Sequence, residues 1–209
     1  EDIAPGLFAW VIPNGKAHRI GVWAQPERLD GRSCEDLYDN LVNHPLWKDR
    51  FKDTHQTGRF KGSLACGMHG NIFKDRVVIF GDAAGLCKPT TGGGITPGFD
   101  QVDMLAPHLV TATLRNDLSA THLKKICKPV EKVRKEHQRA RILRDLFVSS
   151  CDDDELDTTF EIFARSEVVS LINEVGDIEK PVPLGMRLLK DIPEFRRMAI
   201  RATWALLTG

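Results

Sequence analysis

The chain has 209 residues, enough for one well-packed core or for one domain with an appendage. Hydrophobic residues make up 42% and charged residues 28% of it, as in an ordinary globular protein. Lys plus Arg and Asp plus Glu number 29 each, so the charge indicates no nucleic-acid partner, and no apolar run is long enough for a membrane-spanning helix.

The chain opens with two β-like runs, residues 7–13 and 17–24, on either side of Asn14-Gly15. Asn-Gly in this position is the strongest short-range signal for a β-hairpin. Alternation places three apolar side chains on one face of the first run: Phe8, Trp10 and Ile12. Two interpretations are open, a sheet that covers a substrate cavity or a sheet core with buried aromatic residues that needs no ligand.

Residues 33–52 predict a helix that Ser33 caps and Pro45 interrupts. Residues 60–73 predict a strand with glycines at its ends, and 77–82 a second strand. That second strand delivers the carboxylate of Asp82 to its carboxyl end. The small residues after it allow a ligand to approach the backbone closely.

Three glycines at 92–94 then precede a helix predicted over 95–115. Free backbone amides at such a helix start favour negative charge. We expect Thr96 to cap this helix ahead of Pro97, and Pro107 to kink it from the inside.

Residues 121–148 form an amphipathic stretch, with a bend or helix start at Pro129 and His137 on its apolar stripe. Nine Lys and Arg against two Glu lie between Lys124 and Arg144, either as a solvated helix face or as a contact for anionic lipid headgroups. The remaining chain predicts a helix that opens with the acids at 152–155, a linker at Pro181 and Pro183, and a terminal helix from about Pro193.

The five cysteines include no Cys-x-x-Cys pair, so we expect free thiols in a reducing cytosol. Cys87 lies in the loop after Asp82, either as a small packed residue or as a residue with a redox role.

Two motifs carry a resemblance to a known family. The segment Gly81-Asp82-Ala83-Ala84-Gly85 resembles the second flavin-binding motif of FAD-dependent oxidoreductases. Its continuation, which ends in Gly92-Gly93-Gly94-Ile95, resembles the matching segment of the geranylgeranyl reductase family. Pro5 to Pro13 resembles the substrate-side motif of that family, with Phe8 in place of its tyrosine and Ile12 in place of its phenylalanine.

The resemblance implies FAD as the cofactor, with Asp82 on a ribityl hydroxyl of the flavin. It implies these cofactor-binding residues: Gly81, Asp82, Ala83, Ala84, Gly85, Lys88, Pro89, Thr90, Thr91, Gly92, Gly93, Gly94 and Ile95. On the substrate side it implies Phe8, Trp10, Ile12 and Pro13. No metal ligand or catalytic residue is assigned.

The resemblance also implies the fold class, an α/β (α+β) chain that holds part of a three-layer FAD-binding domain. An antiparallel substrate-side sheet and a helical C-terminal region complete it. We expect residues 1–64 to form the substrate-side sheet and helix, 65–115 the C-terminal part of the FAD-binding domain, and 116–209 the helical region. Because no Gly-x-Gly-x-x-Gly loop is present, we expect the chain to be the C-terminal portion of a longer enzyme.

The function that the resemblance implies is reduction of isoprenoid double bonds in a prenyl lipid or a prenyl diphosphate. The electron donor would be NAD(P)H or a ferredoxin-like protein, and the location cytoplasmic, with peripheral membrane contact left open. Two alternatives remain at this point, a related flavin monooxygenase or halogenase, and a non-catalytic flavoprotein fragment that acts as a binding module.

Overall fold

The computed structural model describes residues 1–67, 70–149 and 151–208, with side chains up to residue 200. Its strands are β1 Phe8–Asn14, β2 Ala17–Trp23, β3 Phe73–Lys74 and β4 Val77–Val78. Its α-helices are α1 Cys34–Asn43, α2 Lys48–Phe51, α3 Ile95–Leu114, α4 Ala120–Cys127, α5 Val130–Arg144, α6 Asp153–Phe163, α7 Ser166–Val175, α8 Pro181–Asp191 and α9 Pro193–Thr208. Short 3-10 or π turns are η1 Pro26–Arg28, η2 Gly81–Ala84 and η3 Asp145–Ser149.

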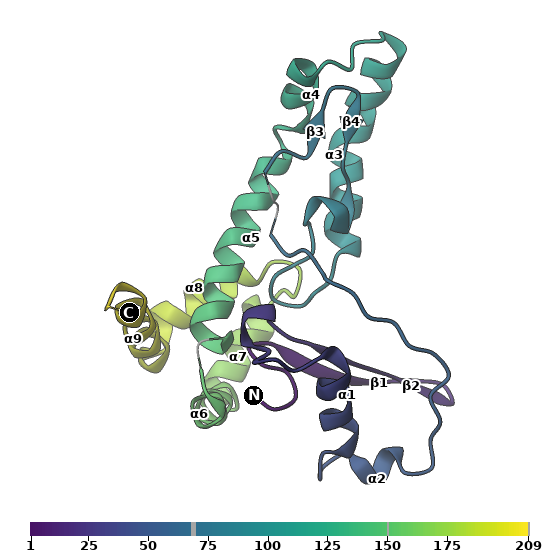
Figure 1. Cartoon of the computed structure of the whole chain (residues 1–209). Coiled ribbons are helices and arrows are strands. Elements are labelled where there is room, and N and C mark those ends of the chain that lie inside the picture. Colours follow the sequence, from purple (N-terminus) through teal and green to yellow (C-terminus); the bar gives the residue numbers. More distant parts are fainter. Residues whose placement is uncertain (68–69, 150, 209) are drawn as a thin grey trace.

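The long helix α5 connects two packed regions (Figure 1). At one end α3 and α4 pack with the small β3–β4 sheet, and at the other end α6 to α9 gather around η3. The β1–β2 hairpin points away from the lower part of α5, and α1 packs against β2. Helices and two small antiparallel sheets thus make up the described chain, which confirms the expected α+β composition with an antiparallel sheet ahead of a helical C-terminal region.

Each end of α5 belongs to a hydrophobic core of its own. The first core is built around Leu86, Leu105 and Leu123, and Val130 at the start of α5 is buried in it. The second core is built around Val168, Leu188 and Phe195, with Phe147 just beyond the end of α5. The Phe147 and Phe195 rings meet edge to face, with centroids 5.2 Å apart. Helix α5 therefore joins the two cores. The segment after β4 contributes Ala84 and Leu86 to the first core.

The local signals in the first third of the chain are confirmed. Strands β1 and β2 pair antiparallel, with Asn14 opposite Ala17, so the hairpin forms as expected and its two turn residues are Gly15 and Lys16. The Ser33 hydroxyl accepts a hydrogen bond from the Asp36 amide, and the Asp36 carboxylate accepts one from the Ser33 amide, so a reciprocal cap starts α1. Helix α1 ends at Asn43, ahead of Pro45, as expected for the residues that precede a proline.

Two strand predictions are wrong in extent. Over 60–73 only Phe73–Lys74 is a strand, and Cys66 makes isolated bridges, because glycines at 62, 67 and 70 interrupt the run. Over 77–82 only Val77–Val78 pairs, since Gly81–Ala84 coils into a 3-10 turn. A buried side chain, Gln101, binds the backbone just before that turn in place of a neighbouring strand.

Helix boundaries differ from the predictions at two places. Helix α3 begins at Ile95, so Thr96 lies in its first turn and is not its cap. Pro181 and Pro183, expected to form a linker, occupy the first turn of α8, where a missing backbone N–H leaves no hydrogen bond unmade. The helix start at Pro129 and the helix that opens with the acids after Asp152 are confirmed. Among the described residues, no helix combines the length and apolarity that crossing a bilayer requires.

Candidate cofactor and substrate site

The segment Gly81 to Gly85 forms a tight turn whose backbone is held by one side chain. Gln101 of α3 is fully buried; its amide nitrogen donates to the Ile79 carbonyl and its amide oxygen accepts from the Gly81 N–H, both at 2.9 Å. Gly81 and Gly85 have φ of +57° and +72°, a region that favours glycine. Gln101 therefore takes the place of a strand partner. Its two bonds hold the backbone immediately before Asp82.

Asp82 and Gly94 approach one another across this turn. A Cβ atom added to Gly94 would lie 1.9 Å from Oδ1 of Asp82, so only glycine leaves room for the carboxylate there. Gly94 is the residue that precedes α3. Among the described residues, no side chain caps the N-terminal end of this helix. The exposed carboxylate of Asp82 thus lies beside the start of α3, where the helix dipole favours negative charge.

The following residues close a backbone loop. The Lys88 amide donates to the Gly93 carbonyl at 3.1 Å, and the Gly92 amide donates to the Lys88 carbonyl at 3.0 Å. The Lys88 side chain, 8% exposed, turns toward the α7–α8 connection and pairs with Glu179 at 2.6 Å. The sequence had placed Lys88 and Pro89 among the cofactor-binding residues; in the structure both are buried, and that role stays a prediction.

Helix α5 contributes a second contact to this loop. The guanidinium of Arg144, 8% exposed on its side chain, donates to the Pro89 carbonyl at 2.8 Å and pairs with Asp145. A buried guanidinium with two partners of this kind is well placed to hold a loop against a helix. The loop 88–93 is therefore fixed from two sides, by Glu179 and by Arg144.

The aromatic face of the hairpin meets the glycine-rich loop. The Phe8 ring lies 5.9 Å from the Trp10 ring and 5.6 Å from the Trp23 ring, measured between centroids. A Cβ atom on Gly92 would lie 3.4 Å from the Trp23 ring, so the indole packs directly over Gly92. The structure thus brings the hairpin motif and the glycine-rich motif together through Trp23, a residue that neither motif includes.

Two residues assigned to the substrate side lie farther along the hairpin. Ile12 pairs with Arg19 and Pro13 with His18, next to the turn, and both side chains are exposed. Phe8 is 37% and Ile12 51% exposed, which does not fit the alternative of an ordinary sheet core. Trp10 lies over Gly21, where a Cβ atom would be 2.1 Å from the ring, so its position depends on that glycine.

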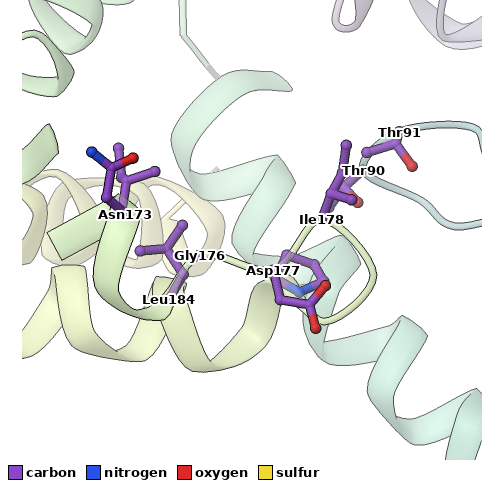
Figure 2. Close-up of a pocket in the computed structure, with 9 residues that line it drawn as sticks. Thr90, Thr91, Asn173, Gly176, Asp177, Ile178 and Leu184 are labelled. Atoms are coloured by element: carbon purple, nitrogen blue, oxygen red, sulfur yellow. The ribbon is translucent and has the colours of Figure 1, made fainter. Parts of the chain in front are cut away.

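A cavity of about 480 Å³ opens on the other side of the loop, between it and α7–α8 (Figure 2). Its walls combine the end of the loop with residues of α7, α8 and their connection: Thr90, Thr91, Ile172, Asn173, Gly176, Asp177, Ile178, Pro181 and Leu184. The buried Thr90 hydroxyl has no hydrogen-bond partner within the described part of the chain. The loop therefore adjoins the aromatic hairpin face at Gly92 and lines this cavity with Thr90 and Thr91.

Three titratable side chains near the loop have shifted pKa values. A hydrogen bond from Cys87 lowers the pKa of Cys66, and the same bond, together with burial, raises the pKa of Cys87. Burial lowers the pKa of His137 on α5 below its usual 6.5, which favours the neutral ring. The prediction that His137 lies on a buried stripe is confirmed. In the described ranges no three His, Cys, Asp or Glu side chains are grouped to hold a metal ion.

Sequence reasoning missed several residues of this site. Trp23 pairs with Phe8 because the turn is Gly15-Lys16; a turn at Asn14-Gly15 would have set Gly21 opposite Phe8, so the sequence register did not point to Trp23. Gln101 and Arg144 carry no local signal, because their partners are backbone groups brought near only by the fold. Cys66 lies in a segment that had been assigned to a strand.

The geometry fits a flavin cofactor. The Asp82 carboxylate requires a glycine at position 94, and the Gly94 amide stands at the start of α3, which lacks a side-chain cap in the described chain. This combination offers an acceptor for a hydroxyl and donors for a negatively charged group. Such a turn and helix start are the parts of a nucleotide or flavin site that one chain segment can supply.

Comparisons with known proteins confirm the family resemblance. The chain is 25% identical to a digeranylgeranylglycerophospholipid reductase of Methanocaldococcus jannaschii over 92% of its own length and 49% of that protein. It is 27% identical to digeranylgeranylglycerophospholipid reductase 3 of Methanosphaera stadtmanae, over 81% of this chain and 42% of that one. An uncharacterized Methanocaldococcus jannaschii protein is 29% identical over 89% of this chain and 46% of its own.

The chain thus spans about half the length of the curated relatives it matches. A geranylgeranyl bacteriochlorophyll reductase-like protein from Thermoplasma acidophilum, of known structure, superposes with a TM-score of 0.70 at 22% identity. The superposition covers 96% of this chain and 48% of the other, and it shows a shared fold. No protein-family profile matches the sequence.

Proposed function

We propose that this protein is part of an FAD-dependent reductase that saturates isoprenoid double bonds of a prenyl lipid or a prenyl diphosphate. The observation that carries the proposal is the contact between Trp23 and Gly92, which joins an exposed aromatic face to a glycine-rich cofactor loop. The names of the relatives, reductases of digeranylgeranylglycerophospholipid, support a prenyl lipid as the substrate class.

The residues that would hold FAD lie on the two sides of the 81–94 segment. Asp82 would accept a hydrogen bond from a ribityl hydroxyl, and Gly81 and Gly85 would leave room for the pyrophosphate. The amide of Gly94 would donate toward negative charge on the ring, while the Gly92 and Gly93 amides hold the loop through the Lys88 carbonyl and the Thr91 hydroxyl. When bound, FAD would supply the hydride that the double bond receives.

The substrate would lie against the aromatic face of the hairpin. Phe8, Trp10 and Trp23 present adjoining rings, and an isoprenoid chain placed there would exchange water for apolar contact. Because Trp23 packs on Gly92, this face adjoins the loop proposed to hold the cofactor. The chain's residues would thus bind and orient the prenyl group and exclude water from it.

The electron donor and the membrane belong to the same proposal. NAD(P)H or a ferredoxin-like protein would reduce the flavin. The exposed basic side chains between Lys124 and Arg141 would contact anionic headgroups that surround a lipid substrate, whereas the Arg144 side chain is buried against the loop. Flotation with anionic and with neutral liposomes tests this part; equal recovery with both would remove the membrane contact from the proposal.

The cofactor site is tested by two substitutions with the same change of charge. Asp82→Ala should weaken FAD binding about 5- to 150-fold, the equivalent of about 1–3 kcal/mol for a hydrogen bond to a charged group. Asp100→Ala removes an exposed carboxylate from α3 outside the site and should leave the affinity unchanged. Fluorescence titration of FAD gives both affinities. Equal binding by wild type and Asp82→Ala would refute the assignment.

A further inference from the structure

Two cysteines from separate segments meet beside the candidate cofactor loop. Cys66 precedes β3 and forms isolated backbone bridges with Leu86 and Cys87, just after the Gly81–Gly85 turn. The bridge between Cys66 and Cys87 is parallel, and neighbouring strands lie about 4.7–4.9 Å apart, within the Cα separation of about 4.4–6.8 Å that a disulfide needs. Both thiols are free in the structure, and the Cys87 thiol, whose proximity lowers the pKa of Cys66, donates to the Lys88 carbonyl at 3.9 Å. The backbone therefore already holds the pair at a separation that a disulfide can span.

The environments of the two thiols divide their roles. Cys87 is fully buried, whereas Cys66 is only partly buried and can meet a small reactant. The hydrogen bond from Cys87 lowers the pKa of Cys66, and the positive charges of Arg144 and Arg141 act in the same direction against burial. The pKa of Cys87 is raised by the bond that it gives and by burial. Cys66 is thus the nucleophile and Cys87 the resolving thiol.

We propose that Cys66 and Cys87 form a reversible dithiol–disulfide site that reacts with small disulfides of the glutathione type. The Cys66 thiolate attacks one sulfur of the external disulfide, whose S–S bond breaks and releases the first thiol. Cys87 then loses its proton and attacks Cys66 in the mixed disulfide, which releases the second thiol. Two protein thiols are oxidised by two electrons, and one external disulfide is reduced to two thiols. This site goes beyond the proposed reductase function and does not depend on it.

The other described cysteines differ from this pair. Cys34 is exposed on α1, Cys127 is buried in the first core, where burial raises its pKa, and Cys151 is buried between η3 and α6. Oxidation of the pair would tie the segment before β3 to Leu86 and Cys87, next to the turn that carries Asp82. The redox state would therefore set how firmly that wall of the candidate cofactor site is held.

The test equilibrates the purified protein in buffers of glutathione and glutathione disulfide, quenches it in acid, alkylates the remaining thiols and maps tryptic peptides by mass. The expected result is one crosslink between the Cys66 and Cys87 peptides, with loss of two of the five thiols and full return after dithiothreitol. The matched variant Cys34→Ser should keep the crosslink. Cys87→Ser should instead trap glutathione on Cys66, and Cys66→Ser should leave Cys87 unmodified.

Two results would overturn the proposal. One is wild-type protein in which Cys66 and Cys87 are both alkylated after equilibration with glutathione disulfide. The other is stable glutathione on Cys66 without a crosslink to Cys87. Both results come from wild-type protein, so they hold even if a variant at the buried Cys87 does not fold.

Discussion

The glycine at position 94 should be needed for cofactor binding and not for folding. Its backbone angles, φ −109° and ψ −14°, suit any residue, so alanine adds no backbone strain. The added Cβ would lie 1.9 Å from Oδ1 of Asp82. The carboxylate would have to withdraw by about 1.5 Å to restore ordinary contact. Because Asp82 is exposed, it can rotate away at a cost of about 0.5–1.5 kcal/mol.

Stability and affinity should therefore respond differently to Gly94→Ala. The rotation cost is offset by about 0.4–1 kcal/mol, since alanine restricts the unfolded chain more than glycine does. The midpoint of urea unfolding should shift little. FAD affinity, measured by fluorescence titration, should fall about 5- to 150-fold, because the displaced carboxylate loses a hydrogen bond worth about 1–3 kcal/mol.

Gly98, one turn along α3, is the matched control. A Cβ atom there meets nothing closer than 3.7 Å, which is ordinary contact. Gly98→Ala should stabilise the fold by about 0.5–1 kcal/mol, as expected for alanine in a helix, and leave FAD affinity as it is. The reasoning would be refuted if Gly94→Ala bound FAD as well as wild type, or if Gly98→Ala weakened binding equally.

Further predictions concern the side chains that hold the loop. Gln101→Leu removes the partners of the Gly81 N–H and the Ile79 carbonyl and should lower the free energy of unfolding by about 2 kcal/mol or more; an unchanged urea midpoint would contradict this role. Glu179→Gln leaves the buried ammonium of Lys88 without its counter-charge and should destabilise by about 1–3 kcal/mol. Adding Lys88→Met should recover part of that loss, and strict additivity of the two changes would argue against the pair. Burial lowers the pKa of His137 in the folded protein below its ordinary value of 6.5. Between the folded and the unfolded pKa the unfolded chain binds more protons, so the free energy of unfolding should fall as the pH drops through that interval. His137→Leu should flatten this part of the profile in urea titrations at several pH values; an unaltered slope would assign the effect to other groups.

Local chemistry explains which elements the sequence could predict. Asn14-Gly15, the Ser33 cap and the Asp152 cap act through neighbouring residues, and all three elements formed where expected. The proline pair at 181 and 183 misled, because a proline favours a linker and the first turn of a helix alike, and the choice depends on packing.

The site was predictable only where it depends on residues that are neighbours in the sequence. Glycine spacing around Asp82 located the turn, since tight backbone geometry leaves a mark in the sequence. The contacts of Gln101, Arg144 and Glu179 join segments far apart in the chain, and no short-range pattern records them. Cys66 was hidden in the same way, because its neighbour Cys87 follows only after β3 and β4.

The central claim is that this chain takes part in flavin-dependent reduction of a prenyl lipid. It is tested most directly by visible absorption of the purified full-length protein loaded with FAD, reduced without oxygen and then mixed with digeranylgeranylglycerophospholipid. The account predicts that bound-flavin absorbance bleaches on reduction and returns on addition of the lipid, whose mass rises by two hydrogens for each bond saturated. Failure to bind FAD, or a reduced flavin that ignores the lipid and is reoxidised only by oxygen, would contradict it.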